Sequence, residues 1–151
     1  MTMWNDLGEF IVNQCVEQTP INKQIKIEKN QNKISNSSCK IVEIAIGKFF
    51  QVSDYLSNFD SIELISTDIN PGREDVIFDD ITSPNMDIYE NAKIIYSIRP
   101  PQELQLFIED IIKNVGAKLI VKPLFNEDLT FNCKMNLKNY KKASFYQKEF
   151  S

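Results

Sequence analysis

The chain has 151 residues and a formal net charge of −4, with 42% apolar and 25% charged residues. This length and balance are typical of one soluble domain with a real core, and no strong field directs the chain to nucleic acid or to a membrane. Histidine is absent, which excludes histidine-based triads, zincin motifs and facial-triad iron sites, so no metal site is expected.

An amphipathic helix is predicted over residues 3 to 17, because apolar side chains recur there at helical spacing. Pro20 ends this helix or starts a second short segment. We interpret residues 1–28 as an N-terminal helical segment and residues 29–39, which are polar and unpatterned, as a surface linker. The α/β core is expected over residues 40–151, within one domain that spans the whole chain.

The core begins with a predicted strand from Lys40 to Ile46, an apolar run of the kind buried on both faces of a parallel sheet. A helix is expected to follow, with Phe49, Val52, Leu56 and Phe59 on its apolar face. Further strands are predicted over residues 61–68 and 75–79. Only six residues separate Asp68 from Asp75, too few for a helical crossover of ~10–12 residues. An extended loop and an antiparallel hairpin both remain open, and we favour the loop.

The second half of the core repeats the alternation of strand and helix. Residues 93–98 predict a fourth strand, and a helix follows with Pro101 at its start and Gly116 after its end. The segment "KLIVKP" predicts a fifth strand, and the tail predicts an antiparallel hairpin around a Lys-Asn-Tyr-Lys-Lys turn. The order predicts an α/β, Rossmann-like three-layer domain with a mainly parallel sheet and a C-terminal antiparallel hairpin.

Two features bear on surroundings and partners. Cys15, Cys39 and Cys133 are widely separated, which favours a reducing cytosol and argues against a disulfide framework or a zinc site. No apolar run reaches the ~18 residues of a membrane span, and no signal-peptide pattern opens the chain, so a cytoplasmic protein is predicted. Lysines and aromatic residues interleave in the tail, but a solvated hairpin explains them better than nucleic-acid binding does.

Open parallel sheets bind ligands beyond the carboxyl ends of their strands, so the residues closing each strand are the candidate site. Glu43, Ala45 and Gly47 close the first strand. A buried carboxylate is costly without a partner. Glu43 therefore either pairs internally, with Arg99 or a lysine, or receives a ligand group, and the adjoining glycine turn favours the ligand.

Acidic residues close the next two strands. Asp68 lies about twenty residues beyond the glycine turn, a spacing typical of an acid that binds ribose hydroxyls, although an Asx turn before "NPG" also explains it. Asp79 or Asp80 is a candidate acceptor from an adenine amino group, and Asp80 is equally able to cap the following segment.

The fourth strand ends in "YSIRPP", which places Ser97 and Arg99 where a second substrate would meet a bound cofactor. Arg99 offers a planar, permanently charged fork for a carboxylate or phosphate. An internal ion pair with Glu43 or a nearby aspartate is an equally good interpretation.

The segments "IVEIAIGKF", "STDI", "FDDIT", "IYSIRPPQELQ" and "NVGAKLIVKPL" resemble, in this order and spacing, the archaeal uncharacterised protein family 0146, over about residues 40 to 146. The resemblance implies a small Rossmann-type domain similar to S-adenosylmethionine-dependent methyltransferases. It implies that Glu43, Ala45 and Gly47 face the methionine part of the cofactor, Asp68 its ribose, and Asp79 or Asp80 its adenine. Ser97 and Arg99 would line the acceptor side.

One departure from the methyltransferase pattern Glu/Asp-x-Gly-x-Gly is Ala45, which stands at the first glycine and adds a methyl group where the backbone approaches ligand. No insertion is long enough to build an acceptor pocket, so an acceptor would need a protein partner or a shallow surface. A methyltransferase with an unknown acceptor is therefore weighed against a non-catalytic nucleotide-binding module or subunit. An NAD-binding domain ranks third, since G-x-G-x-x-G is missing.

Overall fold

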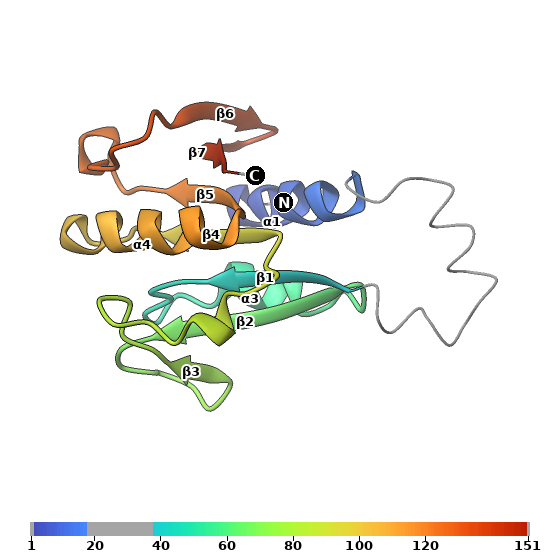
Figure 1. The fold of residues 1–151 in the computed structure, drawn as a ribbon. Helices are drawn as coiled ribbons and strands as arrows, with labels where there is room; N and C mark the ends of the chain where they lie inside the picture. Colours follow the sequence, from blue (N-terminus) through green and yellow to red (C-terminus); the bar gives the residue numbers. More distant parts are fainter. Residues whose placement is uncertain (1, 18–37, 151) are drawn as a thin grey trace.

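The computed structural model describes residues 2–17 and 38–150. Within them, seven strands form one sheet in the order β3-β2-β1-β4-β5-β7-β6 (Figure 1). The strands are β1 (Cys39–Glu43), β2 (Ile62–Asp68), β3 (Val76–Phe78), β4 (Ile94–Ile98), β5 (Lys118–Lys122), β6 (Asn136–Tyr140) and β7 (Ala143–Glu149).

Strands β1 to β5 run parallel to one another, and β7 lies antiparallel to both β5 and β6. The predicted α/β fold with a mainly parallel sheet and a C-terminal hairpin is therefore confirmed. The short connection between β2 and β3 is an extended loop, because Ser66 to Asp68 pair in parallel with Val76 to Phe78. The hairpin alternative is wrong, and the carboxyl ends of β1 to β4 meet at one edge.

Helices cover both faces of the sheet. Helices α1 (Met3–Glu17) and α3 (Gln51–Leu56) lie on one face, and α4 (Gln102–Val115) lies on the other (Figure 1). The core is split in the same way because successive strand residues point to opposite faces. Ile41, Ile94 and Tyr96 pack with α1 and α3, and Val42 and Ile95 pack with α4. Two short 3-10 helices, η2 (Met86–Ile88) and η3 (Asn126–Asp128), complete the described elements.

Helix α4 has the boundaries that its sequence predicts. Pro101 is its N-cap residue, and Gly116 ends it in the left-handed conformation with φ 74°. Helix α3 is shorter than predicted, since it spans only six residues and leaves Phe49 and Phe59 outside. Phe49 is thereby free to line the edge of the sheet rather than a helix face.

The expectation that the cysteines form no disulfide is wrong. The Sγ atoms of Cys15 and Cys39 are bonded, with their Cα atoms 5.9 Å apart, and Cys133 is the free cysteine of the described residues. The two partners are 24 residues apart in the chain, but the last turn of α1 lies against the start of β1. Spacing in the sequence could not show this contact.

Part of the N-terminal prediction lies outside the described residues, namely Pro20 and the linker up to residue 37. Over residues 3–17 the predicted helix is confirmed as α1. No helix of the described part has both the length and the apolar character needed to span a bilayer.

Candidate functional site

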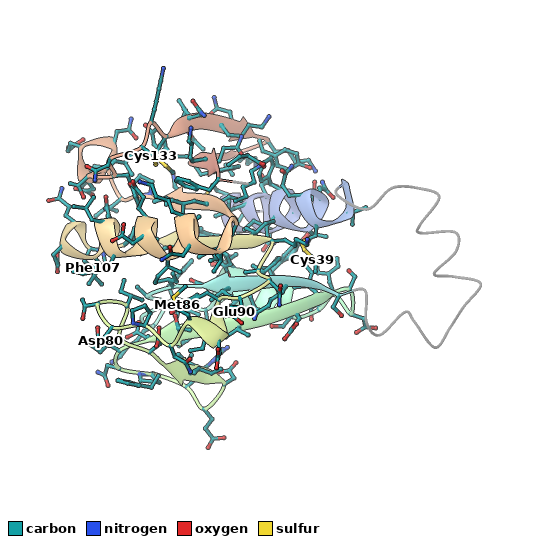
Figure 2. The ribbon with its side chains drawn as sticks, viewed as in Figure 1. Cys39, Asp80, Met86, Glu90, Phe107 and Cys133 are labelled. Atoms are coloured by element: carbon teal, nitrogen blue, oxygen red, sulfur yellow. A yellow bond between two sulfur atoms is a disulfide. The ribbon has the colours of Figure 1, made fainter. Side chains whose placement is uncertain are left out.

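A cavity of about 590 Å³ lies at the carboxyl ends of β1 to β4, next to the start of α4. Figure 2 shows Asp80 at this end of the sheet and Cys39 at the opposite end. The volume lies within the range of small-molecule sites, and such sites are typically apolar with a few polar groups. The lining residues are Ile44, Ala45, Ile46, Gly47, Phe49, Thr67, Asp68, Ile69, Asp79, Asp80, Ile81, Thr82, Ile98, Arg99, Pro101 and Leu104.

The turn after β1 forms one wall of this cavity. Ala45 has φ 57° and Gly47 has φ 61°, both in the left-handed region. For Ala45 this conformation costs about 1–2 kcal/mol relative to a right-handed one. It also explains why β1 ends at Glu43 instead of Ile46, since the chain turns away from the regular ladder at Ala45. The alanine thus adopts a backbone conformation that a glycine would take at no steric cost.

Asp68 ends β2 and faces this turn. Its Oδ2 accepts a hydrogen bond of 2.7 Å from the Gly47 N–H, and its Oδ1 accepts one of 2.9 Å from the Asn70 N–H. The second bond is the predicted Asx turn. Because Asp68 also lines the cavity, the Asx turn and a ligand role are compatible. Each carboxylate oxygen still has acceptor capacity.

The two aspartates after β3 differ in how many of their carboxylate oxygens accept hydrogen bonds from the protein. Asp79 is buried, with its Oδ1 accepting from the Asn85 N–H at 3.0 Å and its Oδ2 from the Tyr89 hydroxyl. Asp80 is half-buried, and its Oδ1 accepts from the hydroxyl and N–H of Thr82, bonds that lower the pKa of this carboxyl. The Oδ2 atom of Asp80 has no partner within the described part of the chain and is the freer acceptor.

Glu43 does not line the cavity. It lies on the face of β1 toward α1 and α3, where its Oε1 accepts a 2.5 Å hydrogen bond from the Tyr96 hydroxyl. Burial raises the pKa of Glu43 to about 8, although the Tyr96 bond opposes part of this shift. Among the described residues, Oε2 has no partner. The internal partner is thus a tyrosine of the neighbouring strand, neither Arg99 nor a lysine.

Ser97 and Arg99, predicted together on the acceptor side, are separated by the structure. Ser97 is buried in β4, donates a 2.7 Å hydrogen bond to the Ile44 carbonyl oxygen and does not line the cavity. Arg99 is exposed and lines the cavity. Its φ is 54°, and its N–H donates to the Lys122 carbonyl oxygen at 2.7 Å.

Two aromatic residues near Arg99 were not predicted as part of the site. The guanidinium carbon of Arg99 lies 5.4 Å from the ring centroids of both Trp4 and Phe49. These two rings also contact each other, with centroids 4.7 Å apart. The sequence indicated only apolar helix faces for both residues, and no local pattern reveals that α1 meets the turn after β1.

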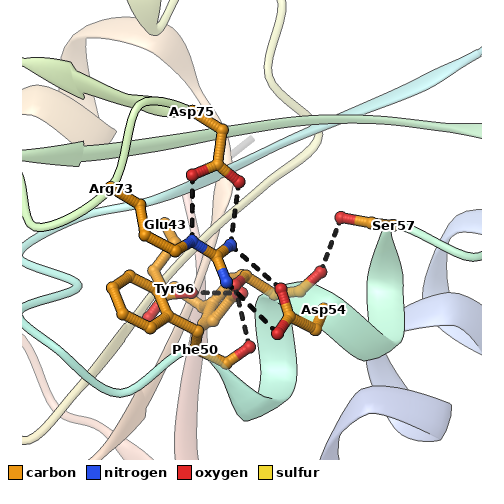
Figure 3. A network of polar contacts seen from close by, with 8 residues as sticks. Glu43, Phe50, Asp54, Ser57, Arg73, Asp75 and Tyr96 are labelled. Atoms are coloured by element: carbon orange, nitrogen blue, oxygen red, sulfur yellow. Dashed lines mark hydrogen bonds and ion pairs between the residues drawn. The ribbon is translucent and has the colours of Figure 1, made fainter.

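The loop between β2 and β3 is fixed by an arginine (Figure 3). Arg73 forms ion pairs with Asp54 of α3 at 2.9 Å and with Asp75 at 2.8 Å, and its guanidinium stacks on Phe50 at 4.0 Å. Gly72 lies close to the Gly47 carbonyl oxygen, where a Cβ would stand at 3.5 Å. The loop that carries Ile69 is therefore held against the turn after β1.

The cavity has an acidic side and a cationic side. Asp68, Asp79 and Asp80 come from the ends of β2 and β3, and Arg99 comes from the end of β4. The described residues contain no cluster of three or more metal-ligating side chains. Of the eight predicted site residues, six line this cavity, but their roles toward a ligand stay predictions.

Comparison with known proteins gives a family. The model of the "Uncharacterised protein family (UPF0146)" matches residues 25–150. A UPF0146 protein of Methanothermobacter thermautotrophicus is 39% identical over 145 residues, which cover 96% of this chain and 94% of that protein. A UPF0146 protein of Methanocaldococcus jannaschii is 40% identical over 138 residues, covering 85% of this chain and 98% of that protein.

Among solved structures, the antibiotic-resistance methyltransferase Kmr has a similar fold. The TM-score is 0.50 at 8% sequence identity, and the match covers 79% of this chain and 89% of that one. At this identity the likeness concerns the fold alone. It agrees with the methyltransferase-like arrangement that the sequence predicts.

Proposed function

The chain belongs to the uncharacterised protein family UPF0146, and we propose that it binds S-adenosylmethionine in the cavity at the sheet edge and acts as a methyltransferase. The observation that carries this proposal is the position of Asp68. Its carboxylate lies at the end of β2, is oriented by the Gly47 N–H, and lines the cavity of about 590 Å³. An acid at this place suits the hydroxyls of a ribose.

The other lining residues supply complementary roles. Asp80 is proposed to accept from the adenine amino group, because its Oδ2 is free among the described residues whereas both oxygens of Asp79 are bonded. Ile69, which is 60% exposed, and Ile81 offer apolar surface to the adenine ring. The turn from Ala45 to Gly47 is proposed to face the methionine part.

The charges of the cavity fit this ligand. S-Adenosylmethionine carries a sulfonium and an ammonium group, and the acids that close β2 and β3 make their side of the cavity favourable for cations. When bound, it supplies a methyl group already activated on sulfur, so the protein mainly has to hold donor and acceptor in line. The absence of histidine is no obstacle to such a reaction.

Calorimetric titration with S-adenosylhomocysteine tests the binding step. We expect saturable binding to the wild-type protein, weakened in Asp68→Ala by about 1–3 kcal/mol, the typical free energy lost with a ligand hydrogen bond to a charged group. Asp60→Ala is the matched control, because Asp60 is an exposed acid before the other end of β2. It should leave the affinity unchanged.

No binding at millimolar S-adenosylhomocysteine would contradict the proposal. Binding without transfer of a labelled methyl group to any component of an extract would instead indicate a non-catalytic module. The same titration with NADH tests the third alternative, an NAD-binding domain. NADP is disfavoured, because Asp68 would repel its 2′-phosphate.

A further inference from the structure

Arg99 is the less constrained of the two arginines in the chain. The guanidinium of Arg73 is bonded to two carboxylates. In contrast, no carboxylate of the described residues lies within ion-pair distance of Arg99. An arginine that no internal acid neutralises, at the rim of a ligand-sized cavity, is available to an anion from outside.

A second, smaller cavity adjoins the first at this residue. It measures about 240 Å³ and is lined by Arg99, Pro100, Pro101, Gln102, Leu124 and Asp128. Arg99 and Pro101 line both cavities, so Arg99 lies where a molecule in the smaller cavity would meet one in the larger. The smaller cavity therefore offers space for a second ligand next to one in the larger cavity.

The charged groups that line the smaller cavity are Arg99 and Asp128. Burial lowers the pKa of Lys122, and the positive charge of Arg99 lowers it further. The Lys122 ammonium donates to the Ser144 carbonyl oxygen at 2.7 Å and does not line the cavity. Asp128 is the one acid lining the smaller cavity, and its Oδ2 accepts a hydrogen bond from the Phe125 N–H at 3.1 Å. The smaller cavity thus pairs one cation that has no carboxylate partner among the described residues with one acid that already accepts a hydrogen bond from the main chain.

The surroundings of Arg99 are apolar and aromatic. Trp4 and Phe49 flank the guanidinium at 5.4 Å, and Leu124 lines the smaller cavity although it is 59% exposed. Flat rings beside an arginine leave the edge of its fork free for bidentate hydrogen bonds. The site therefore combines an anion-binding group with apolar surface for an organic body.

We propose that the methyl acceptor is a small organic anion whose carboxylate or phosphate binds Arg99 in the smaller cavity. The inference rests on the proposed function, since it names the acceptor class for the same site. The acceptor's anionic group is held by the guanidinium, and its organic part packs against Leu124, Pro101 and the ring of Phe49. Its reactive atom then points from Arg99 toward the larger cavity.

The single tryptophan of the chain gives a readout that needs no catalysis. Trp4 is adjacent to Arg99, so titration of the full-length protein with benzoate or phenyl phosphate should change its fluorescence in a saturable way. Benzamide, the neutral counterpart of benzoate, should bind at least tenfold more weakly. The tighter of the two anions shows whether the natural group is a carboxylate or a phosphate.

Two variants locate the site. Arg99→Gln should weaken binding of the preferred anion at least tenfold. Lys93→Gln removes the same charge just before the other end of β4, at an exposed position, and should leave the affinity unchanged. A melting temperature within about 2 °C of the wild type, checked by circular dichroism, establishes that Arg99→Gln is folded.

The outcome separates this inference from the proposed function. S-Adenosylhomocysteine binding without anion binding overturns the acceptor site alone. Anion binding without S-adenosylhomocysteine binding overturns the proposed function and with it the methyl-acceptor role, and it leaves an anion site at Arg99. If saturating S-adenosylhomocysteine displaces the anion, or if Arg99→Gln weakens S-adenosylhomocysteine as much as the anion, then Arg99 serves the cofactor's own carboxylate. Either result would overturn the inference. Benzamide binding as tightly as benzoate would do the same.

Discussion

The loop after β2 and the connection after β4 each carry one arginine at the same edge of the sheet. The two arginines differ in whether carboxylates of the protein bond to them. Arg73 is bonded to Asp54 and Asp75 and stacks on Phe50 (Figure 3). Arg99 has two aromatic neighbours and no carboxylate partner within the described residues. Charged groups that are bonded to other side chains of the protein stabilise the fold, whereas charged groups without such partners are available to a ligand.

The four acids that the sequence predicted for the site divide along the same line. Glu43 and Asp79 are buried and bonded to tyrosine hydroxyls, whereas Asp68 and Asp80 lie at the rim and bond backbone or threonine groups. We therefore expect changes at the first pair to affect stability and changes at the second pair to affect binding. Two measurements test this division and a third tests the contrast between the arginines, in order of decreasing effect.

The largest effect is expected at Glu43. Its pKa is about 8 in the folded protein and about 4.3 in an unfolded chain. Between these pH values the folded protein holds a proton that the unfolded chain has released, so the free energy of unfolding falls as pH rises from about 4.5 to about 8. The fall amounts to roughly 3–6 kcal/mol. Glu43→Gln removes the titrating group and should flatten this part of the profile, as measured by urea unfolding at pH 5, 7 and 9.

Glu63→Gln is the control for this measurement, since Glu63 is exposed on the neighbouring strand β2. Its stability profile should run parallel to that of the wild type. If the profile of Glu43→Gln also runs parallel to that of the wild type, Glu43 has no raised pKa in the folded protein, and its assignment to the stabilising acids is wrong.

A smaller effect is expected at Tyr89. Tyr89→Phe removes the hydroxyl that donates to the buried Asp79, and a buried acceptor that loses its donor costs about 1–3 kcal/mol of stability. Chemical unfolding at pH 7 measures this loss, with Tyr146→Phe on β7 as the control. Because Asp80 is the proposed adenine contact, affinity for S-adenosylhomocysteine should stay within about twofold. A stable Tyr89→Phe protein that no longer binds would move Asp79 into the ligand-facing group.

The smallest effect compares the two arginines directly. Arg73→Gln breaks exposed ion pairs and should lower the melting temperature only slightly, because solvent screens such pairs. Arg99→Gln removes no ion pair and should change stability by less than about 0.5 kcal/mol. Thermal unfolding of both variants at low and high salt distinguishes them, because only the loss at Arg73 should shrink when salt screens the ion pairs. Equal losses would contradict the contrast between the two loops.

Much of the fold follows from local patterns. Apolar runs gave the buried parallel strands, and Pro101 and Gly116 marked both ends of α4. Asp68, Asp80 and Arg99, which close strands at the rim, line the cavity as their places in the sequence predict, while their roles toward a ligand stay predictions. Glu43 and Ser97 were misplaced, because neither spacing nor chemistry shows which way a residue of a doubly buried strand points. The disulfide and the rings beside Arg99 were missed, since both depend on how α1 packs across the sheet.

The disulfide between Cys15 and Cys39 helps to fix helix α1, and with it the position of Trp4. Helix α1 brings Trp4 to Arg99 and is joined to the sheet through this bond at its other end. In a reducing solution, only noncovalent packing would hold the indole in place. The thiol–disulfide balance of the buffer is therefore a variable to fix before affinities measured by tryptophan emission are compared between preparations.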